Sequence, residues 1–179
     1  MNFSKHLKRI GLLSSSKFVL ISVLLACAGS MANAKAPGPN WKIYVNARFS
    51  YIACYPAALL TAQGEAPDGD GQAFLGAHGA KLLVYGGFNM DNHDPRASLA
   101  ATINRLRAAG GIVSAAHHGP GFFTLSGIQG GSIIDEKRLF NGVVYQTLRL
   151  SYPAREQSMF KPLLAHMIKC FAALTRKPT

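Results

Sequence analysis

The clearest strand pattern of the chain is in residues 112–152, IVSAAHHGPGFFTLSGIQGGSIIDEKRLFNGVVYQTLRLSY. This stretch contains four runs rich in β-branched and aromatic residues, separated by the glycine-containing segments HHGPG, GIQGG and FNG. Runs of this length and composition, bounded by glycine turns, are typical of strands joined by hairpins. The stretch therefore predicts consecutive antiparallel strands at residues 112–116, 122–126, 132–139 and 143–152.

More strands are predicted on the N-terminal side of this stretch. Two short β-favouring runs come first, and a hairpin around the turn Gly76-Ala77-His78-Gly79 follows them. These strands are expected at residues 41–45, 49–55, 72–75 and 81–86. Between them, residues 64–71 (GEAPDGDG) are so rich in turn-forming residues that we expect a loop there.

Two segments show helical rather than strand periodicity. From Ser98 onward, Leu99, Ile103 and Leu106 follow helical spacing, and Gly110-Gly111 would end that helix. Residues 154–174 carry a broad apolar stripe and should form a long helix that covers one face of the sheet. The predicted fold class is α+β: a mostly antiparallel sheet flanked by an internal helix and a long C-terminal helix.

The N-terminal segment has the organisation of an export leader. Basic residues precede an apolar run at 18–28, and Ala32-Asn33-Ala34 forms a small-residue cleavage site. We expect a signal peptide at 1–34, a linker at 35–40 and one domain at 41–175. Because Leu24-Leu25-Ala26-Cys27 resembles a lipobox, acylation of Cys27 stays open as an alternative, which would make the protein an outer-membrane lipoprotein rather than a periplasmic or secreted one.

Two cysteines remain after the leader, Cys54 and Cys170. In an oxidising compartment two cysteines can form one disulfide, and a loop of this size would contribute on the order of 4 kcal/mol in the chain-entropy model. We expect Cys54 and Cys170 to be bridged. The alternative is a pair of buried free thiols.

The charge of the chain is basic but scattered. Without residues 1–34, 15 basic residues stand against 8 acidic ones, a net charge of +7. Such a protein could bind anionic lipid or glycan, although no basic run of five or more residues occurs. No basic–aromatic motif indicates a nucleic-acid partner.

Candidate chemistry is sparse, and we assign no catalytic residue, cofactor or metal site. Asp68-Gly69-Asp70-Gly71 begins like a calcium loop, but the twelfth position is Gly79 instead of glutamate. Histidine and aspartate are zinc ligands. An alternative hypothesis is therefore a metal site formed by His93 and Asp94 in one connector and by His117 and His118 in another. Nothing in the sequence brings these two connectors together.

Several blocks of the sequence follow the order of a known pattern. They are Asn46-Ala47-Arg48-Phe49-Ser50-Tyr51, Cys54-Tyr55-Pro56, Gly64-Glu65 with Asp68-Gly69-Asp70-Gly71-Gln72, Leu125-Ser126-Gly127 and Leu148-Arg149-Leu150-Ser151-Tyr152-Pro153, before a closing helix. Their order is similar to that of small exported proteobacterial proteins of uncharacterised function. It also resembles the PsbP-like α/β/α sandwich over most of residues 41–171. The resemblance implies a non-enzymatic accessory domain that docks onto partners, and it carries over no catalytic residues.

The sequence thus leads to one main functional hypothesis and two alternatives. The main hypothesis is an exported, non-enzymatic α+β domain that binds an unknown partner in the cell envelope. One alternative is a metal-dependent hydrolase that uses His93, Asp94, His117 and His118. The other is a basic binder of anionic glycan or lipid.

Overall fold

The protein is described by a computed structural model over residues 38–174. The predicted leader at 1–34, with Cys27, lies outside this range, as does the first half of the linker at 35–40. Leader cleavage and lipidation therefore stay predictions. Within residues 38–174, no helix combines the length and the apolar character needed to cross a membrane.

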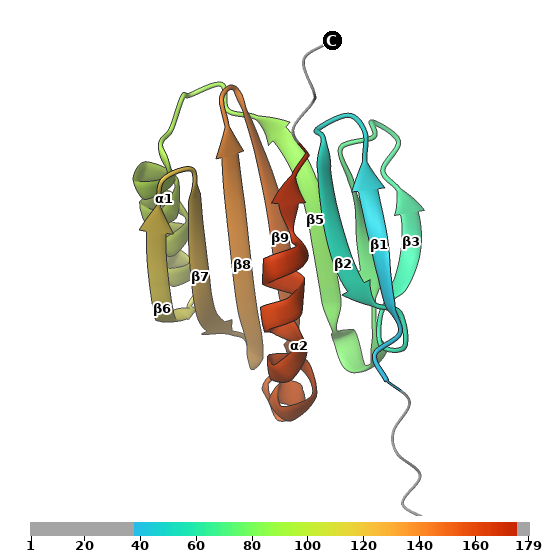
Figure 1. Ribbon diagram of the computed structural model, residues 1–179. Coiled ribbons are helices and arrows are strands. Elements are labelled where there is room, and N and C mark those ends of the chain that lie inside the picture. The colour runs from blue at the N-terminus through green and yellow to red at the C-terminus, as the bar shows by residue number, and fades with distance from the viewer. Residues whose placement is uncertain (1–37, 175–179) are drawn as a thin grey trace, which may run out of the picture. The chain divides into compact units, whose positions relative to one another are not determined.

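A seven-stranded, fully antiparallel sheet forms the centre of the fold (Figure 1). In spatial order its strands are β3 (Thr61–Glu65), β4 (Gly71–Leu75), β5 (Lys81–Phe88), β9 (Val144–Pro153), β8 (Ser132–Asn141), β7 (Phe122–Gln129) and β6 (Ile112–Gly119). The four consecutive strands predicted between 112 and 152 are confirmed, each with its hairpin partner.

A smaller sheet joins the two ends of the described chain. It consists of β1 (Trp41–Asn46), β2 (Tyr51–Pro56) and the two-residue β10 (Ala172–Ala173), in the order β1-β2-β10. Both β1 and β10 pair antiparallel with β2, which therefore lies in the middle. The backbone of Leu174 continues this contact, because its N–H donates to the Ser50 carbonyl at 2.7 Å.

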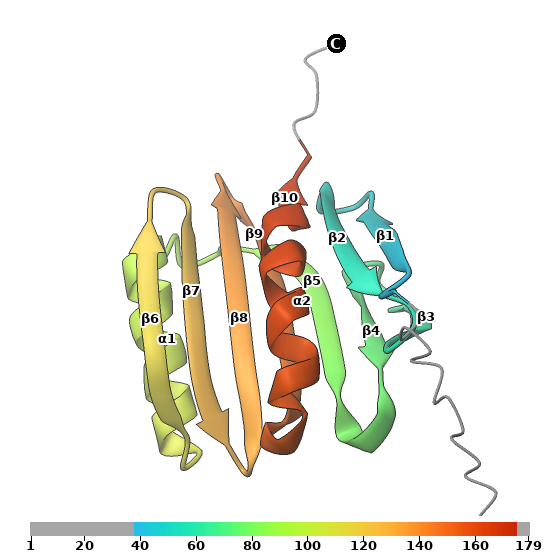
Figure 2. The same cartoon turned by 60° about the horizontal axis from the view of Figure 1, so that its bottom comes forward.

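The helices lie on opposite faces of the large sheet (Figures 1 and 2). Helix α1 (Pro95–Ala108) covers β6, β7 and β8 from one side, with Leu99 and Leu106 packed on Phe123, Leu125 and Ile134. Helix α2 (Gln157–Cys170) lies on the other side with the small sheet. There Phe160, Met167 and the following Phe171 join the larger core, which includes Tyr51, Phe74 and Leu148. The expected α+β class, with helices flanking an antiparallel sheet, is confirmed.

Several boundaries differ from the sequence-based expectations. The predicted loop at 64–71 is shorter, because Gly64 and Glu65 belong to the exposed edge strand β3 and only residues 66–70 form the turn. The internal helix begins at Pro95 rather than Ser98, with Asp94 as its N-cap. The C-terminal helix ends at Cys170, because Phe171 takes an extended conformation that leads into β10.

The helix predicted from residue 154 also begins later than expected. Residues Ala154–Glu156 form a short 3₁₀ turn, η2, and a second one, η1 (Ala77–Gly79), lies in the β4–β5 hairpin. The two turns contact each other through His78 Nδ1 and Glu156 Oε1, which are 2.5 Å apart. The hairpin turn is thereby fixed to the start of α2.

Candidate functional site

The face of the sheet beneath α1 carries a buried ion-pair cluster. Glu136 of β8 is 2% exposed, and its two carboxylate oxygens accept from Arg138 and Arg149 at 3.1 and 3.2 Å. Glu136 lies directly opposite Arg149 in the β8–β9 register, and Arg138 follows two residues along the same strand. Residues two apart in a strand point to the same face, so one carboxylate can hold both guanidinium groups.

Three further contacts hold the Arg138 side chain in place. Its Nε donates to Thr147 Oγ1 at 3.0 Å, and its guanidinium carbon lies 5.3 and 4.9 Å from the ring centroids of Phe123 and Tyr145. Planar guanidinium groups stack favourably on aromatic faces, so these contacts orient the side chain without neutralising it. The charge of Arg138 is therefore held in a defined place, with 12% of the side chain exposed.

Two neighbouring cavities open between α1 and this cluster, and Arg105 of α1 lines both. The larger, of about 370 Å³, is also lined by Arg138 and Tyr145; the smaller, of about 240 Å³, is lined by Arg149. We call the region bounded by Arg105, Glu136, Arg138 and Arg149 the α1 crevice. Glu136 pairs with Arg138 and Arg149, and Arg105 lines both cavities, so the region keeps an excess of positive charge even with the exposed Asp91 at the mouth.

Exposed apolar residues lie near the mouth of the α1 crevice. Phe88 and Met90, which line the larger cavity, are 55% and 86% exposed, and Val143 is 74% exposed. The backbone holds them close together, because the Asn89 N–H donates to the Val143 carbonyl at 2.8 Å. The ring of Phe88 packs 5.3 Å from that of Phe49, on the other face of the sheet, so we call only Met90 and Val143 the apolar rim. Exposed apolar groups beside fixed charges are typical of surfaces that bind a partner.

The first pair of proposed metal ligands has a structural role in this region. The Asp94 carboxylate accepts from the Ala97 N–H at 2.6 Å and caps the N-terminus of α1. The backbone of His93 is held by the Asn89 side chain, which donates to its carbonyl at 2.9 Å and accepts from its N–H at 3.1 Å. These bonds give the connector a fixed shape at the mouth of the α1 crevice.

The second pair does not lie in a turn as predicted. His117 and His118 belong to β6, where they pair with Thr124 and Phe123 respectively. Neighbouring residues of a strand point to opposite faces, so the two imidazoles cannot bind one ion from a regular strand. Across residues 38–174, no three His, Cys, Asp or Glu side chains are grouped so that they could hold a metal ion. The metal-dependent alternative therefore has no site in the described chain.

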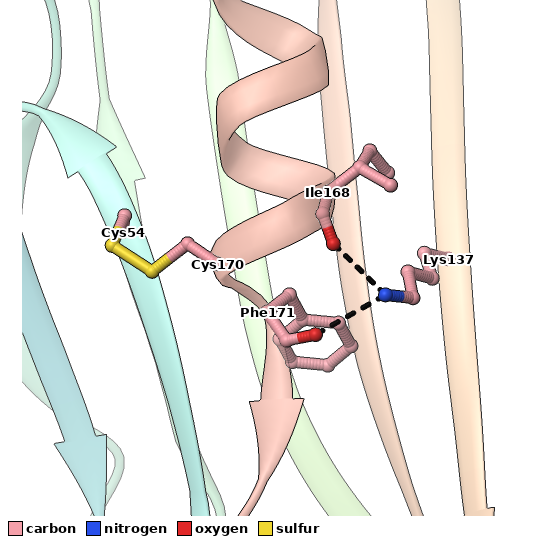
Figure 3. The surroundings of a disulfide bond; sticks show 5 residues. All are labelled: Cys54, Lys137, Ile168, Cys170 and Phe171. Atoms are coloured by element: carbon pink, nitrogen blue, oxygen red, sulfur yellow. Dashed lines mark hydrogen bonds between the residues drawn. A yellow bond between two sulfur atoms is a disulfide. The ribbon is translucent and has the colours of Figure 1, made fainter.

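The structure joins Cys54 and Cys170 in a disulfide, in agreement with the expected bridge (Figure 3). Their Cα atoms are 5.7 Å apart, and the bridge attaches the end of α2 to β2. Beside it, Lys137 of β8 donates to the carbonyls of Ile168 and Phe171 at 2.8 and 3.2 Å. Burial among these groups lowers the pKa of Lys137. A covalent bond and the hydrogen bonds of a charged donor thus hold the same end of α2 from two sides.

The acidic turn between β3 and β4 is braced by β1. The Glu65 carboxylate accepts from Tyr44 at 2.8 Å and from Asn46 at 2.9 Å, and Asn46 also donates to the Gly69 carbonyl at 2.9 Å. Burial of Tyr44 is the main cause that raises the pKa of its hydroxyl, so the hydroxyl stays a donor. The turn that resembled a calcium loop is thus held by hydrogen bonds within the protein.

Comparison with known proteins supports the fold. No protein-family model and no curated protein matches the chain at the level of sequence. Among solved structures, the chain is similar to the solution structure of cyanobacterial PsbP (CyanoP) from Synechocystis sp. PCC 6803. The TM-score is 0.55 and the identity 15%, over 74% of this chain and 92% of that one. At this identity the match shows a PsbP-like fold, as the sequence blocks had suggested.

Proposed function

We propose that the protein is an exported, non-enzymatic accessory domain that docks onto a protein partner in the cell envelope through the α1 crevice. The observation that carries the proposal is the apolar rim beside fixed, incompletely neutralised arginines. A partner that places an acidic side chain in the crevice and apolar side chains against Met90 would satisfy both features. Export to the periplasm or cell surface rests on the leader predicted at 1–34.

The recessed position of the Arg138 charge favours a protein, rather than a membrane surface, as the partner of the α1 crevice. Arg138 keeps only 12% of its side chain exposed, so a flat layer of lipid headgroups would meet the apolar rim before it reached this charge. A protruding glutamate or aspartate can enter a cavity of about 370 Å³ and pair with Arg138 and Arg105. The likeness to the PsbP fold supports an accessory role, because the resemblance implies docking rather than catalysis.

Site-specific photocrosslinking in intact cells tests this proposal. A photoreactive residue would replace Met90 of the apolar rim, and in a matched control it would replace Met159, which is 42% exposed on α2 at the other face of the sheet. We expect a discrete protein adduct from position 90 alone, and we expect Arg105→Glu to abolish it. Arg105 lies exposed on α1, so this substitution should leave the core intact.

Three results would count against docking by a protein at this surface. An adduct with lipid or glycan would favour the basic-surface alternative. Adducts of equal yield from positions 90 and 159 would mean that the apolar rim is not a specific surface. An adduct from position 90 that persists with Arg105→Glu would remove the charge of the α1 crevice from the explanation.

A further inference from the structure

A second buried carboxylate lies on the other face of the sheet. Asp135 of β8 is 5% exposed, and its oxygens accept from Ser126 Oγ at 2.6 Å and from the Tyr152 hydroxyl at 3.3 Å. Burial, followed by the charge of Asp135, raises the pKa of Tyr152 to about 12, so this phenol remains a donor at neutral pH. Both contacts come from neutral hydroxyls.

Asp135 differs from its neighbour Glu136 because, among the described residues, no cationic side chain pairs with its carboxylate. Glu136 is paired with two arginines, whereas no lysine, arginine or histidine of residues 38–174 lies within 4.0 Å of the Asp135 carboxylate. Lys137 shares the face of Asp135, but its ammonium is bound to the carbonyls of Ile168 and Phe171. A buried charge without a counter-charge is costly, so a ligand that supplies a cationic donor would gain much from binding there.

The carboxylate is at the side of a groove, where a ligand can approach it. Helix α2 lies in front of β9 and leaves the same face of β6 and β7 without a helix (Figure 2). Between that face and α2 lies a groove of about 340 Å³, lined among others by Ser126, Asp135 and Tyr152 from the sheet and by Lys161 from α2. Small-molecule sites typically have volumes of about 300 to 1,000 Å³.

The remaining lining of the groove narrows the chemistry of the ligand. Lys161 supplies a positive charge at an exposed position on α2, more than 4.0 Å from Asp135. Ile128, Ile133 and Leu164 supply an apolar wall. One site thus offers a carboxylate, a separate ammonium and a hydrocarbon surface, which is the complement of a zwitterion with an aliphatic side chain.

We propose that this groove binds a small aliphatic amino acid, whose ammonium pairs with Asp135 and whose carboxylate pairs with Lys161. The Ser126 and Tyr152 hydroxyls orient the Asp135 carboxylate, and the apolar wall contacts the aliphatic side chain. The site is on the opposite face of the sheet from the α1 crevice. The proposal of amino-acid binding can therefore be tested independently of the docking proposed above.

NMR titration of the ¹⁵N-labelled protein tests this inference with three probes. They are L-leucine, isopentylamine, which lacks the carboxylate, and 4-methylpentanoate, which lacks the ammonium. We expect L-leucine to shift the amide signals of Ser126, Asp135 and Lys161 saturably, and to bind more tightly than either partial probe. Asp135→Asn should weaken binding of both amines at least about tenfold, as the loss of a charged hydrogen bond would.

Two exposed lysines of α2, one inside the groove and one outside it, allow a test that does not alter the core. Lys161→Met should weaken binding of L-leucine but not of isopentylamine, whereas Lys169→Met, at an exposed position of the same helix outside the groove, should change neither. Absence of saturable shifts with all three probes at millimolar concentration would overturn the inference. Undiminished amine binding by Asp135→Asn, or equal affinity for L-leucine and isopentylamine, would overturn it too.

Discussion

The Lys137 ammonium and the Ile168 carbonyl are 2.8 Å apart, which places a strand lysine at the C-terminal end of helix α2. The last carbonyls of a helix lack partners within the helix and carry a partial negative charge, so a cation there is favourable. The same ammonium reaches the Phe171 carbonyl, where the chain leaves the helix for β10. Lys137 thus stabilises the change of direction that brings the chain back to the small sheet.

Replacing Lys137 with methionine should lower the free energy of unfolding by about 1 to 3 kcal/mol, because two carbonyls lose a charged donor. Methionine retains most of the apolar stem, so the packing against Phe171 is largely kept. Urea denaturation followed by circular dichroism measures the change. Lys169→Met, at an exposed position of α2, is the control, and equal stability of the two variants would refute the capping role.

Removal of the disulfide should have a larger effect. Cys54 and Cys170 are 116 residues apart in sequence, and loss of a native bridge costs about 2 to 5 kcal/mol. We expect the Cys54→Ala, Cys170→Ala double variant to unfold at lower urea, with amides of β10 and the last turn of α2 exchanging fastest. Unchanged exchange in those segments would show that other contacts hold the end of α2.

Replacing Asp135 and Glu136 by their amides should change the free energy of unfolding by very different amounts. Glu136→Gln leaves two arginines without their carboxylate, and breaking a buried pair costs about 3 to 5 kcal/mol. Asp135→Asn removes a buried charge that has no cation, so we expect a small change, within about 1 kcal/mol, of either sign. Chemical denaturation of both variants makes the comparison. A loss at Asp135 as large as that at Glu136 would mean that a cation already pairs with Asp135.

Asp70 gives a pH-dependent prediction. Burial and the neighbouring Asp68 carboxyl raise the pKa of Asp70 above its usual 3.8. As the pH rises, the unfolded chain therefore releases this proton first, and the stability present below pH 3.8 declines as the pH passes through the folded-state pKa.

Asp70→Asn removes the ionisable group and with it the loss of stability that occurs as the pH rises. We expect this variant to match the unaltered protein in urea denaturation at acidic pH, below the usual Asp pKa, and to be slightly more stable at neutral pH. Asp91→Asn, on the exposed connector before α1, serves as the control for the loss of one charge. Lower stability of Asp70→Asn at neutral pH would show that the ionised carboxylate stabilises the turn.

Gly86 allows close packing between β5 and the loop before β2. A Cβ atom at this position would lie 2.3 Å from Cβ and Cγ of Phe49, which is buried. Gly86→Ala should therefore displace the Phe49 ring and cost about 1 to 3 kcal/mol in thermal or urea unfolding. Gly38→Ala, where a Cβ meets nothing within 4 Å, should be neutral. A neutral Gly86→Ala would mean that Phe49 moves at no cost.

The hairpins of the large sheet could be predicted from sequence because each rests on local signals, glycine turns between β-favouring runs. The two-residue turn Gly142-Val143 even fixes the register that places Glu136 opposite Arg149. Edge strand β3 could not be predicted, because its residues are all exposed and show no apolar alternation. Strand β10 could not be predicted either, because its two alanines depend on distant contacts with β2.

The α1 crevice was missed for a similar reason. Glu136 and Arg149 could be paired from the hairpin register, but Arg105 comes from a helix whose packing face only the tertiary structure defines. The glycine and proline that follow His117 and His118 are turn signals and predict a turn there, whereas the strand extends to Gly119. The number of cysteines predicts the disulfide between Cys54 and Cys170, and the predicted elements already place Cys54 on a strand and Cys170 on the C-terminal helix, as the structure does.

The small sheet can be completed only after most of the chain has been synthesised. Its middle strand emerges early from the ribosome, but the strand and the cysteine that complete it follow more than a hundred residues later. Until then the edge of β2 has no β10 to pair with, and Tyr51 lacks the Phe171 ring that packs 6.0 Å from it. A chain stalled before residue 170 lacks the partner of Cys54 in this bridge. Protection of the Cys54 thiol from alkylation therefore identifies chains that have reached the end of α2 in an oxidising compartment.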